Sequence, residues 1–240
     1  MKKLLSKFNL GDAYEIQARV LPAMLVVLPI AILVGQIAWR QKGWLAVIGW
    51  GTGLEVVFAI LVSKLGHAMG ARLQDRLTKE WGGLPTMRWL RPNDPSHSEQ
   101  QKKIWRKAVS TLSGLKVDRE LKGNDLAEAD RVIEDAIVAC RNKVRSSRKA
   151  DLLNKHNVAF GFARNLAGMR WLALSISLVC LLASTYGTIE KEWDVAGTIL
   201  QGAFFVIAAV NCFVSINYVK HCSIRYAEFF FVTVVAITDD

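Results

Sequence analysis

Four long apolar stretches constrain the fold of this chain more than any other feature of its sequence. They cover residues 20–39, 44–62, 171–189 and 196–219. A helix needs about 20 apolar residues to cross the hydrocarbon core of a bilayer. Because each stretch reaches about that length, the sequence predicts four membrane-spanning helices, with a very apolar soluble helical protein as the alternative.

Charge is concentrated between the second and third stretches. Residues 71–170 contain 21 Lys and Arg against 12 Asp and Glu, in a chain whose net charge is +10. The links between spans one and two and between spans three and four contain few basic residues. Since Lys and Arg collect on the cytoplasmic side of a membrane, we expect both termini and the middle segment to be cytoplasmic.

The predicted fold class is an all-α membrane protein with four transmembrane helices and a helical cytoplasmic domain inserted between spans two and three. Its parts are a cytoplasmic arm (1–19), spans one and two (20–64), the basic helical domain (65–170), spans three and four (171–219) and a cytoplasmic tail (220–240). In the basic domain, Ser96 or Ser98 and Gly114 are the start and stop signals of one helix.

Several polar residues lie inside the predicted spans and are candidates for conduction or gating. They are Gln36, Glu55, Gln201, Asn211 and Ser215. A carboxyl group at mid-membrane is costly, so Glu55 is either functional or paired with a neighbouring helix. The other four either line a pore or hold helices together. Four spans do not enclose a wide pore, so a conduction path is expected between the subunits of a symmetric ring.

Basic residues of the middle segment form clusters that suit a polyanion. The candidate phosphate ligands are Lys102, Lys103, Arg106 and Lys107 on one helix, Arg141, Arg145, Arg148 and Lys149 on another, and Arg88 and Arg91 in a turn. Trp81, Trp89 and Trp105 lie among them and could stack bases. Contact with anionic lipid headgroups predicts the same charge and remains open.

The stretch EWGGLPTMRWLRPND, residues 80–94, cannot form one regular element, because Gly82, Gly83 and Pro85 interrupt helix and strand alike. We interpret it as the turn that ends the extension of span two. Arg88 and Arg91 are expected to remain available to a phosphate.

The sequence contains no pattern of an enzyme. It has no helix-borne H-E-x-x-H, no P-loop and no C-x-x-C pair, and its four His residues are scattered. We therefore expect no catalytic residue, no metal and no cofactor. A membrane-embedded lipid enzyme is the least favoured hypothesis.

Four segments resemble a family of bacterial four-span membrane effectors of anti-phage defence. YEIQARVLPAMLVVLP (14–29) resembles the start of span one in that family, and KEWGGLPTMRWLR (79–91) resembles its W-G-G-x-P-T loop. AEADRVIEDAIVACRNKVR (127–145) and KHNVAFGFARNLAGMR (155–170) are similar to two further family segments. The chain departs from the pattern at Ile133, Phe160 and Ala163, the last of which replaces an arginine and puts any ligand contact there in doubt.

Within this family the chain resembles the membrane channel component of the Hailong system. The resemblance implies a homo-oligomeric ion channel of the bacterial inner membrane, for which we assume a tetramer. It further implies a nucleotidyltransferase-like partner enzyme that makes a single-stranded DNA oligomer, and bound DNA that keeps the channel shut. A non-conducting membrane scaffold that recruits a cytoplasmic partner is the alternative.

Overall fold

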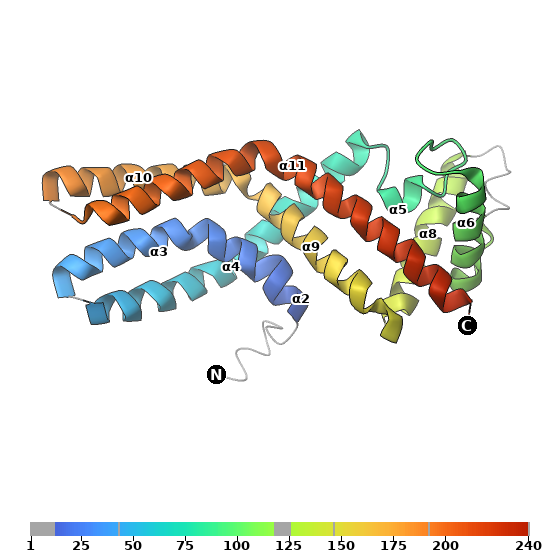
Figure 1. Ribbon diagram of the computed structural model, residues 1–240, viewed down its shortest axis with the longest axis horizontal. Helices are drawn as coiled ribbons and strands as arrows, with labels where there is room; N and C mark the ends of the chain where they lie inside the picture. The colour runs from blue at the N-terminus through green and yellow to red at the C-terminus, as the bar shows by residue number, and fades with distance from the viewer. Residues whose placement is uncertain (1–12, 43, 118–125, 146, 192, 240) are drawn as a thin grey trace. The chain divides into compact units, whose positions relative to one another are not determined.

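All regular structure in the described part of the chain is helical (Figure 1). The computed structural model describes residues 13–42, 44–117, 126–145, 147–191 and 193–239. Its long helices are α3 (Leu21–Lys42), α4 (Trp44–Glu80), α6 (Glu99–Ser113), α8 (Leu126–Arg145), α9 (Asp151–Gly168), α10 (Arg170–Lys191) and α11 (Val195–Thr238). Four short elements are α2 (Ala13–Glu15), the π-helical turn η1 (Ile16–Val20), α5 (Pro85–Arg88) and the 3-10 turn η2 (Arg148–Ala150). The predicted all-α class is confirmed.

Three helical segments among the described residues are long and apolar enough to cross a membrane. They are Ile16–Trp39, Arg170–Lys191 and Val195–Thr238, and they indicate a multi-pass membrane protein. The predicted second span lies within α4, but the side chains of residues 40–57 are outside the described part of the chain. Glu55 is among them, so the second span and the role of Glu55 stay predictions.

Helix α11 is much longer than a bilayer requires. Its 44 residues extend over about 66 Å at 1.5 Å per residue, whereas a hydrocarbon core is about 30 Å thick. About half of α11 therefore has to lie outside any membrane it crosses.

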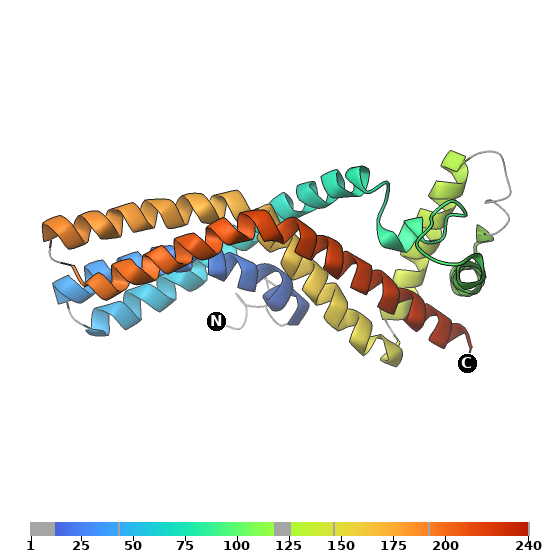
Figure 2. The ribbon, with the colours of Figure 1, turned by 45° about the horizontal axis from the view of Figure 1, so that its top comes forward.

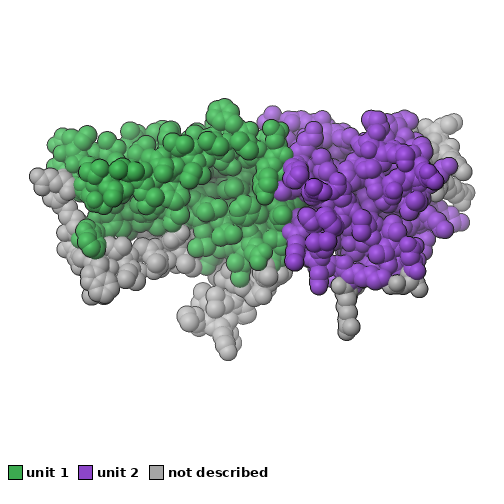
Figure 3. Space-filling model, in the orientation of Figure 1, with its two compact units in different colours: residues 1–75, 158–219 green, residues 76–157, 220–240 purple. Residues whose placement is uncertain are grey.

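The chain divides into two compact units (Figure 3). Unit 1 comprises residues 1–75 and 158–219, and unit 2 comprises residues 76–157 and 220–240. Helices α4, α9 and α11 each contribute residues to both units. This division differs from the ranges expected from sequence, because residues 220–238 are helical and belong to the same unit as the basic segment.

In unit 1, α3, α10 and the first half of α11 lie alongside one another (Figures 1 and 2). Ala23 and Val26 of α3, Met169, Ala173 of α10 and Ala208 of α11 form a buried apolar cluster. Most larger side chains of α10 and α11 in this unit point outward instead; Val179 and Phe213, for example, are 65% and 83% exposed. This arrangement suits helices that are surrounded by lipid and approach one another through small residues.

The start of span one is shaped by a proline. Pro22 has no N–H, so the carbonyl group of Ala18 loses its ordinary helical donor four residues on. The chain forms the π-helical turn η1 here, and the side chain of Asn165 donates to the Ala18 carbonyl at 2.7 Å instead. Because Asn165 is fully buried, this bond fixes η1 against α9.

Glycines allow α9 to approach its neighbours closely. A Cβ atom on Gly168 would lie 2.6 Å from the backbone nitrogen of Gly70, and one on Gly161 would lie 2.9 Å from the Cβ of Ala18. The segments 14–29 and 155–170, singled out in the sequence, therefore meet at this crossing.

Unit 2 has an aromatic core. The ring of Trp105 stacks on Phe231 with centroids 4.5 Å apart, and Trp89 stacks on Trp105 at 5.8 Å. Phe230 and Phe231 are fully buried, so the second half of α11 supplies the centre of this core. Ile133, Ala136, Ile137 and Cys140 of α8 complete it, as the helical spacing of these residues predicts.

Candidate functional site

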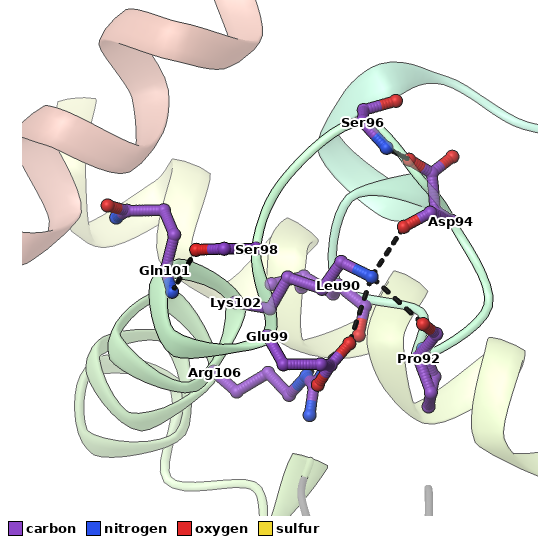
Figure 4. Close-up of polar contacts among 9 residues, drawn as sticks. All are labelled: Leu90, Pro92, Asp94, Ser96, Ser98, Glu99, Gln101, Lys102 and Arg106. Carbon is purple, nitrogen blue, oxygen red and sulfur yellow. Dashed lines mark hydrogen bonds and ion pairs between the residues drawn. The ribbon is translucent and has the colours of Figure 1, made fainter.

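Two of the four predicted phosphate ligands on α6 are buried. Lys102 is 2% exposed, and its ammonium group donates to the carbonyl groups of Pro92 and Asp94 and to Glu99 (Figure 4). Arg106 is 6% exposed, and its guanidinium group donates to the carbonyl of Leu90 at 2.9 Å and to Glu99 at 3.0 Å. These two cations hold the 90–94 loop against α6, which contradicts their predicted role as phosphate ligands.

The sequence contained a signal for this burial. Lys102, Trp105, Arg106 and Val109 share one helical face with spacing i, i+3, i+4 and i+7, and two of them belong to the apolar core. Lys103 and Lys107 lie on the exposed side of α6, where they remain candidates for a polyanion.

The basic face of α8 is partly exposed. The side chain of Arg145 is exposed, whereas Arg141 is half-buried with its guanidinium carbon 5.8 Å from the centre of the Tyr226 ring. The Nε of Arg141 is buried without a hydrogen-bond partner, whereas its Nη2 donates to the hydroxyl of Thr86 at 3.5 Å. Lys149 is exposed, and its ammonium group donates to the carbonyl of Ala236 at 2.7 Å. The side chain of Arg148 lies outside the described part.

The 80–94 stretch is a helix-ending turn, as expected. Gly82 has φ +69°, and the N–H groups of Gly82 and Gly83 donate to the carbonyls of Lys79 and Thr78, the bonding pattern of a Schellman C-cap. Pro85 then begins α5.

Arg88 and Arg91 are not available to a phosphate in this turn. Arg88 forms an ion pair with Asp94 at 2.8 Å and donates to the carbonyl of Trp81. Arg91 donates to both carboxylate oxygens of Asp130 at 2.8 and 2.9 Å, which joins the turn to α8. The expectation that these arginines stay free is wrong.

The proposed base-stacking tryptophans are also largely inside the fold. Trp89 and Trp105 are 5% and 8% exposed and belong to the core. Trp81 alone of the three is partly exposed.

Polar residues of the spans form contacts between helices of one chain. Gln201 is fully buried, and its Nε2 donates to the carbonyl of Pro29 at 2.9 Å. Gln36 accepts a hydrogen bond from Ser184 at 3.0 Å, and Ser184 lies 2.7 Å from the hydroxyl of Thr198. For Gln36 and Gln201 the structure therefore favours the interhelical interpretation over the pore lining.

Two further candidates differ from these glutamines. Ser215 is buried, and its Oγ has no hydrogen-bond partner. Asn211 is partly exposed on α11, so it is the remaining polar candidate of this helix for a path outside the single-chain bundle.

Sequence reasoning gave little weight to a polar cluster at the crossing of α4 and α9. Arg164 donates to Gln74 at 2.8 Å and to Asn165 at 3.3 Å, and it lies 3.2 Å from the Nδ1 of His67. Burial lowers the pKa of His67, and Arg19 and Arg164 lower it further. The sequence gives no signal that Arg164 meets Gln74 and His67, because these residues are 90 and 97 positions away in the chain.

Among the described residues, no group of three His, Cys, Asp or Glu side chains is placed to hold a metal ion. Comparisons with protein-family models, curated proteins and solved structures find no match to this chain.

Proposed function

We propose that this chain is a multi-pass membrane effector, a homo-oligomeric ion channel gated by a nucleic-acid or nucleotide signal on the basic unit 2. Its role would be abortive anti-phage defence through disruption of the bacterial inner membrane. The observation that supports it best is α11. One helix provides a candidate span and, from residue 220 onward, the aromatic core of the basic unit.

The proposed signal would bind the exposed cations of unit 2. These are Lys103 and Lys107 on α6, Arg145 on α8 and Lys149, with Arg141 held against Tyr226. Burial removes Lys102 and Arg106 from the ligand set. Arg88 and Arg91 are left out because their guanidinium groups pair with Asp94 and Asp130. Binding would bias one of two arrangements of the helices shared by the two units, which is how a ligand shifts a conformational equilibrium.

A conduction path would form between copies of the chain. Gln36 and Gln201 are used within one chain, so the proposed path lies along the partly exposed Asn211, with Glu55 as the second gating candidate. A ring of four copies, both termini cytoplasmic and four spans per copy are parts of the same proposal, as is a nucleotidyltransferase-like partner enzyme.

Binding of a labelled single-stranded DNA to detergent-solubilised protein across a salt series tests the ligand part. Replacing Lys103, Lys107 and Arg145 with Gln should weaken binding and reduce the salt slope by about 0.7 for each lost phosphate contact. The control removes the same charge by replacing the exposed Arg76, Lys79 and Arg131 with Gln. Binding that is absent or insensitive to salt contradicts the proposal.

Ion flux from liposomes tests the channel part. The reconstituted protein should conduct in one ligand state and not in the other, and Glu55→Gln should alter that conduction.

The alternative is a scaffold that anchors a cytoplasmic partner without conducting. The hydrogen bonds that Gln36 and Gln201 form between helices of one chain favour this alternative. They explain why these polar residues lie in the spans without a pore. Liposomes that never leak under any ligand condition, with Glu55→Gln tolerated, would support the scaffold.

A further inference from the structure

The polar cluster at the crossing of α4, α9 and η1 contains two arginines from segments distant in the sequence. The bond from Asn165 to the Ala18 carbonyl brings the residues next to them, Arg164 and Arg19, into the same region. The two guanidinium groups are near enough that Arg19 helps to lower the pKa of Arg164, after burial as the larger cause.

Acidic residues compensate this charge only in part. Arg19 pairs with Glu15 through one terminal nitrogen, while its Nε is buried without a hydrogen-bond partner. Arg164 has only neutral partners: Gln74, Asn165 and His67.

Other charged groups near the cluster do not remove this imbalance. Tyr14 and, more weakly, Asp75 oppose the lowering of the Arg164 pKa. Asp75 acts from a distance, since no carboxylate of the described residues forms an ion pair with this arginine. Lys64 and Arg72 are exposed on α4, on the same stretch of helix as His67, and add further positive charge. Guanidinium groups with N–H donors to spare and few carboxylate partners are suited to bind an additional anion.

The cluster lies at the level where spans begin. Arg19 is in the first turns of the candidate span Ile16–Trp39, and the candidate span Arg170–Lys191 starts shortly after Arg164. Trp171 is 60% exposed, and the guanidinium of Arg170 lies 5.7 Å from its ring centre. Such exposed Trp and Arg residues are typical of the headgroup region of a bilayer. The anion available at that depth is a lipid phosphate.

We propose that Arg19 and Arg164 form a binding site for the phosphate of an anionic phospholipid, which thereby ties η1 to α9 at the membrane surface. The site is separate from the ligand surface proposed for unit 2, and neither proposal depends on the other. The phosphate accepts hydrogen bonds from N–H groups of both arginines that the protein leaves unused.

Native mass spectrometry of the full chain in detergent tests the site. Three probes are used: dimyristoyl phosphatidylglycerol, dimyristoyl phosphatidylcholine and glycerol phosphate, which has the anionic headgroup without acyl chains. We expect retention of phosphatidylglycerol to exceed that of phosphatidylcholine by roughly tenfold or more. Each arginine should favour the anionic lipid by about 1 kcal/mol, and about 1.4 kcal/mol corresponds to a factor of ten. Equal retention of the two lipids overturns the proposal. If glycerol phosphate competes as well as phosphatidylglycerol, the site binds a soluble anion, and the lipid assignment is wrong.

A variant pair separates this site from general positive charge. Arg19→Gln with Arg164→Gln should reduce the retention of phosphatidylglycerol to the phosphatidylcholine level. Arg76→Gln with Arg131→Gln removes the same charge from exposed positions and should leave retention unchanged. If both double variants lose phosphatidylglycerol retention to the same extent, the binding is due to general positive charge and the specific site is contradicted.

A measurement on the unmodified protein covers the case in which the Arg19 and Arg164 variant does not fold. Phosphatidylglycerol should raise the thermal midpoint of the wild type relative to phosphatidylcholine, because a ligand that binds only the folded state stabilises it. The difference should shrink at 1 M salt, where the Debye length is about 3 Å. A midpoint that is the same in both lipids overturns the proposal.

Discussion

The two units distribute polarity in opposite ways. In unit 1, Ile189, Ile199 and Phe213 are 72%, 69% and 83% exposed, whereas Gln201 is fully buried. In unit 2, the rings of Trp89 and Phe231 are buried, and most charged residues lie outside. A protein folds to hide what its surroundings do not solvate. The contrast supports the proposal that the apolar helices of unit 1 cross the membrane and that unit 2 lies in water.

The exceptions to this contrast also differ. Unit 2 buries the cation Lys102, with two carbonyls and a carboxylate around it, whereas unit 1 buries the neutral amide Gln201, with one bond and an Oε1 that has no partner. A buried charge is costly to leave unpaired, and a neutral amide less so.

The largest effect is expected at the aromatic core of unit 2. Phe231→Ala removes a fully buried ring stacked on Trp105 and should cost about 3–5 kcal/mol of unfolding free energy. Val232→Ala, at a neighbouring position that is 61% exposed, should change it by about 0.5 kcal/mol or less. Thermal unfolding followed by tryptophan fluorescence measures both. Equal effects would show that residues 220–238 do not form this core.

Two adjacent lysines give the next largest difference. Lys102→Ala leaves the carbonyls of Pro92 and Asp94 without their donor and should destabilise the protein by about 2–4 kcal/mol. Lys103→Ala alters an exposed side chain and should be nearly neutral, while weakening any polyanion binding. The same unfolding assay compares them, and a neutral Lys102→Ala would refute the loop-holding role.

Gln201→Leu should have a smaller effect than Lys102→Ala. It removes one hydrogen bond to Pro29 but also the buried oxygen without a partner. Polar contacts between membrane helices contribute about 0.6 kcal/mol on average, so we expect a change of about 1 kcal/mol or less in either direction. A loss as large as that of Lys102→Ala would remove the distinction between the two units.

Acidification should produce the smallest effect. Burial is the largest cause of the lowered pKa values of His67 in unit 1 and of His97 and His156 in unit 2. The unfolded chain then binds protons first as the pH falls below about 6.5. The contribution of these histidines to the unfolding free energy should be fully present above about pH 6.5. It should be lost as the pH falls from about 6.5 towards 5, before most carboxylates take up protons.

The pH dependence is attributable to individual histidines. His156→Gln, at the ring stacked on Phe229, should flatten part of this dependence. A melting temperature that rises as the pH falls from 7 to 5 would contradict the assignment.

Local signals predicted several elements correctly from sequence. The helix expected to start at Ser96 or Ser98 and to end at Gly114 is confirmed, with Ser98 as its N-cap. The Ser98 hydroxyl accepts from the N–H of Gln101, and Gly114 has φ +86°. The Gly82–Gly83 turn is confirmed by its backbone bonds. Such features depend on a few neighbouring residues, so a sequence is sufficient to find them.

Tertiary pairing explains what the sequence did not reveal. Residues 220–238 look like an apolar tail until they meet Trp89 and Trp105, which lie more than 100 residues earlier in the chain. Arg91 looks like a free cation until Asp130 is placed beside it. Charge in a sequence therefore does not distinguish a ligand-binding arginine from one that holds a turn, because partners distant in the chain decide which it is.

Four valines test the opposite surroundings of the two units most directly. Val179 and Val206 in unit 1 and Val138 and Val232 in unit 2 are exposed to similar extents, at 65%, 58%, 48% and 61%. Each is replaced singly by Cys and labelled in native membranes, opened so that both faces are accessible, with a water-soluble maleimide. The background is Cys212→Ala; the three other native cysteines are buried, and burial raises the pKa of the Cys140 thiol to about 11.

We expect Val232→Cys and Val138→Cys to react with the water-soluble reagent and Val179→Cys and Val206→Cys not to react. Val206 and Val232 lie on the same helix, so they compare the two surroundings within one element. After denaturation in sodium dodecyl sulfate the same reagent should also label Val179→Cys and Val206→Cys, because their thiols are then exposed to water and can ionise. Equal labelling of all four by the water-soluble reagent would contradict the assignment of unit 1 to the bilayer.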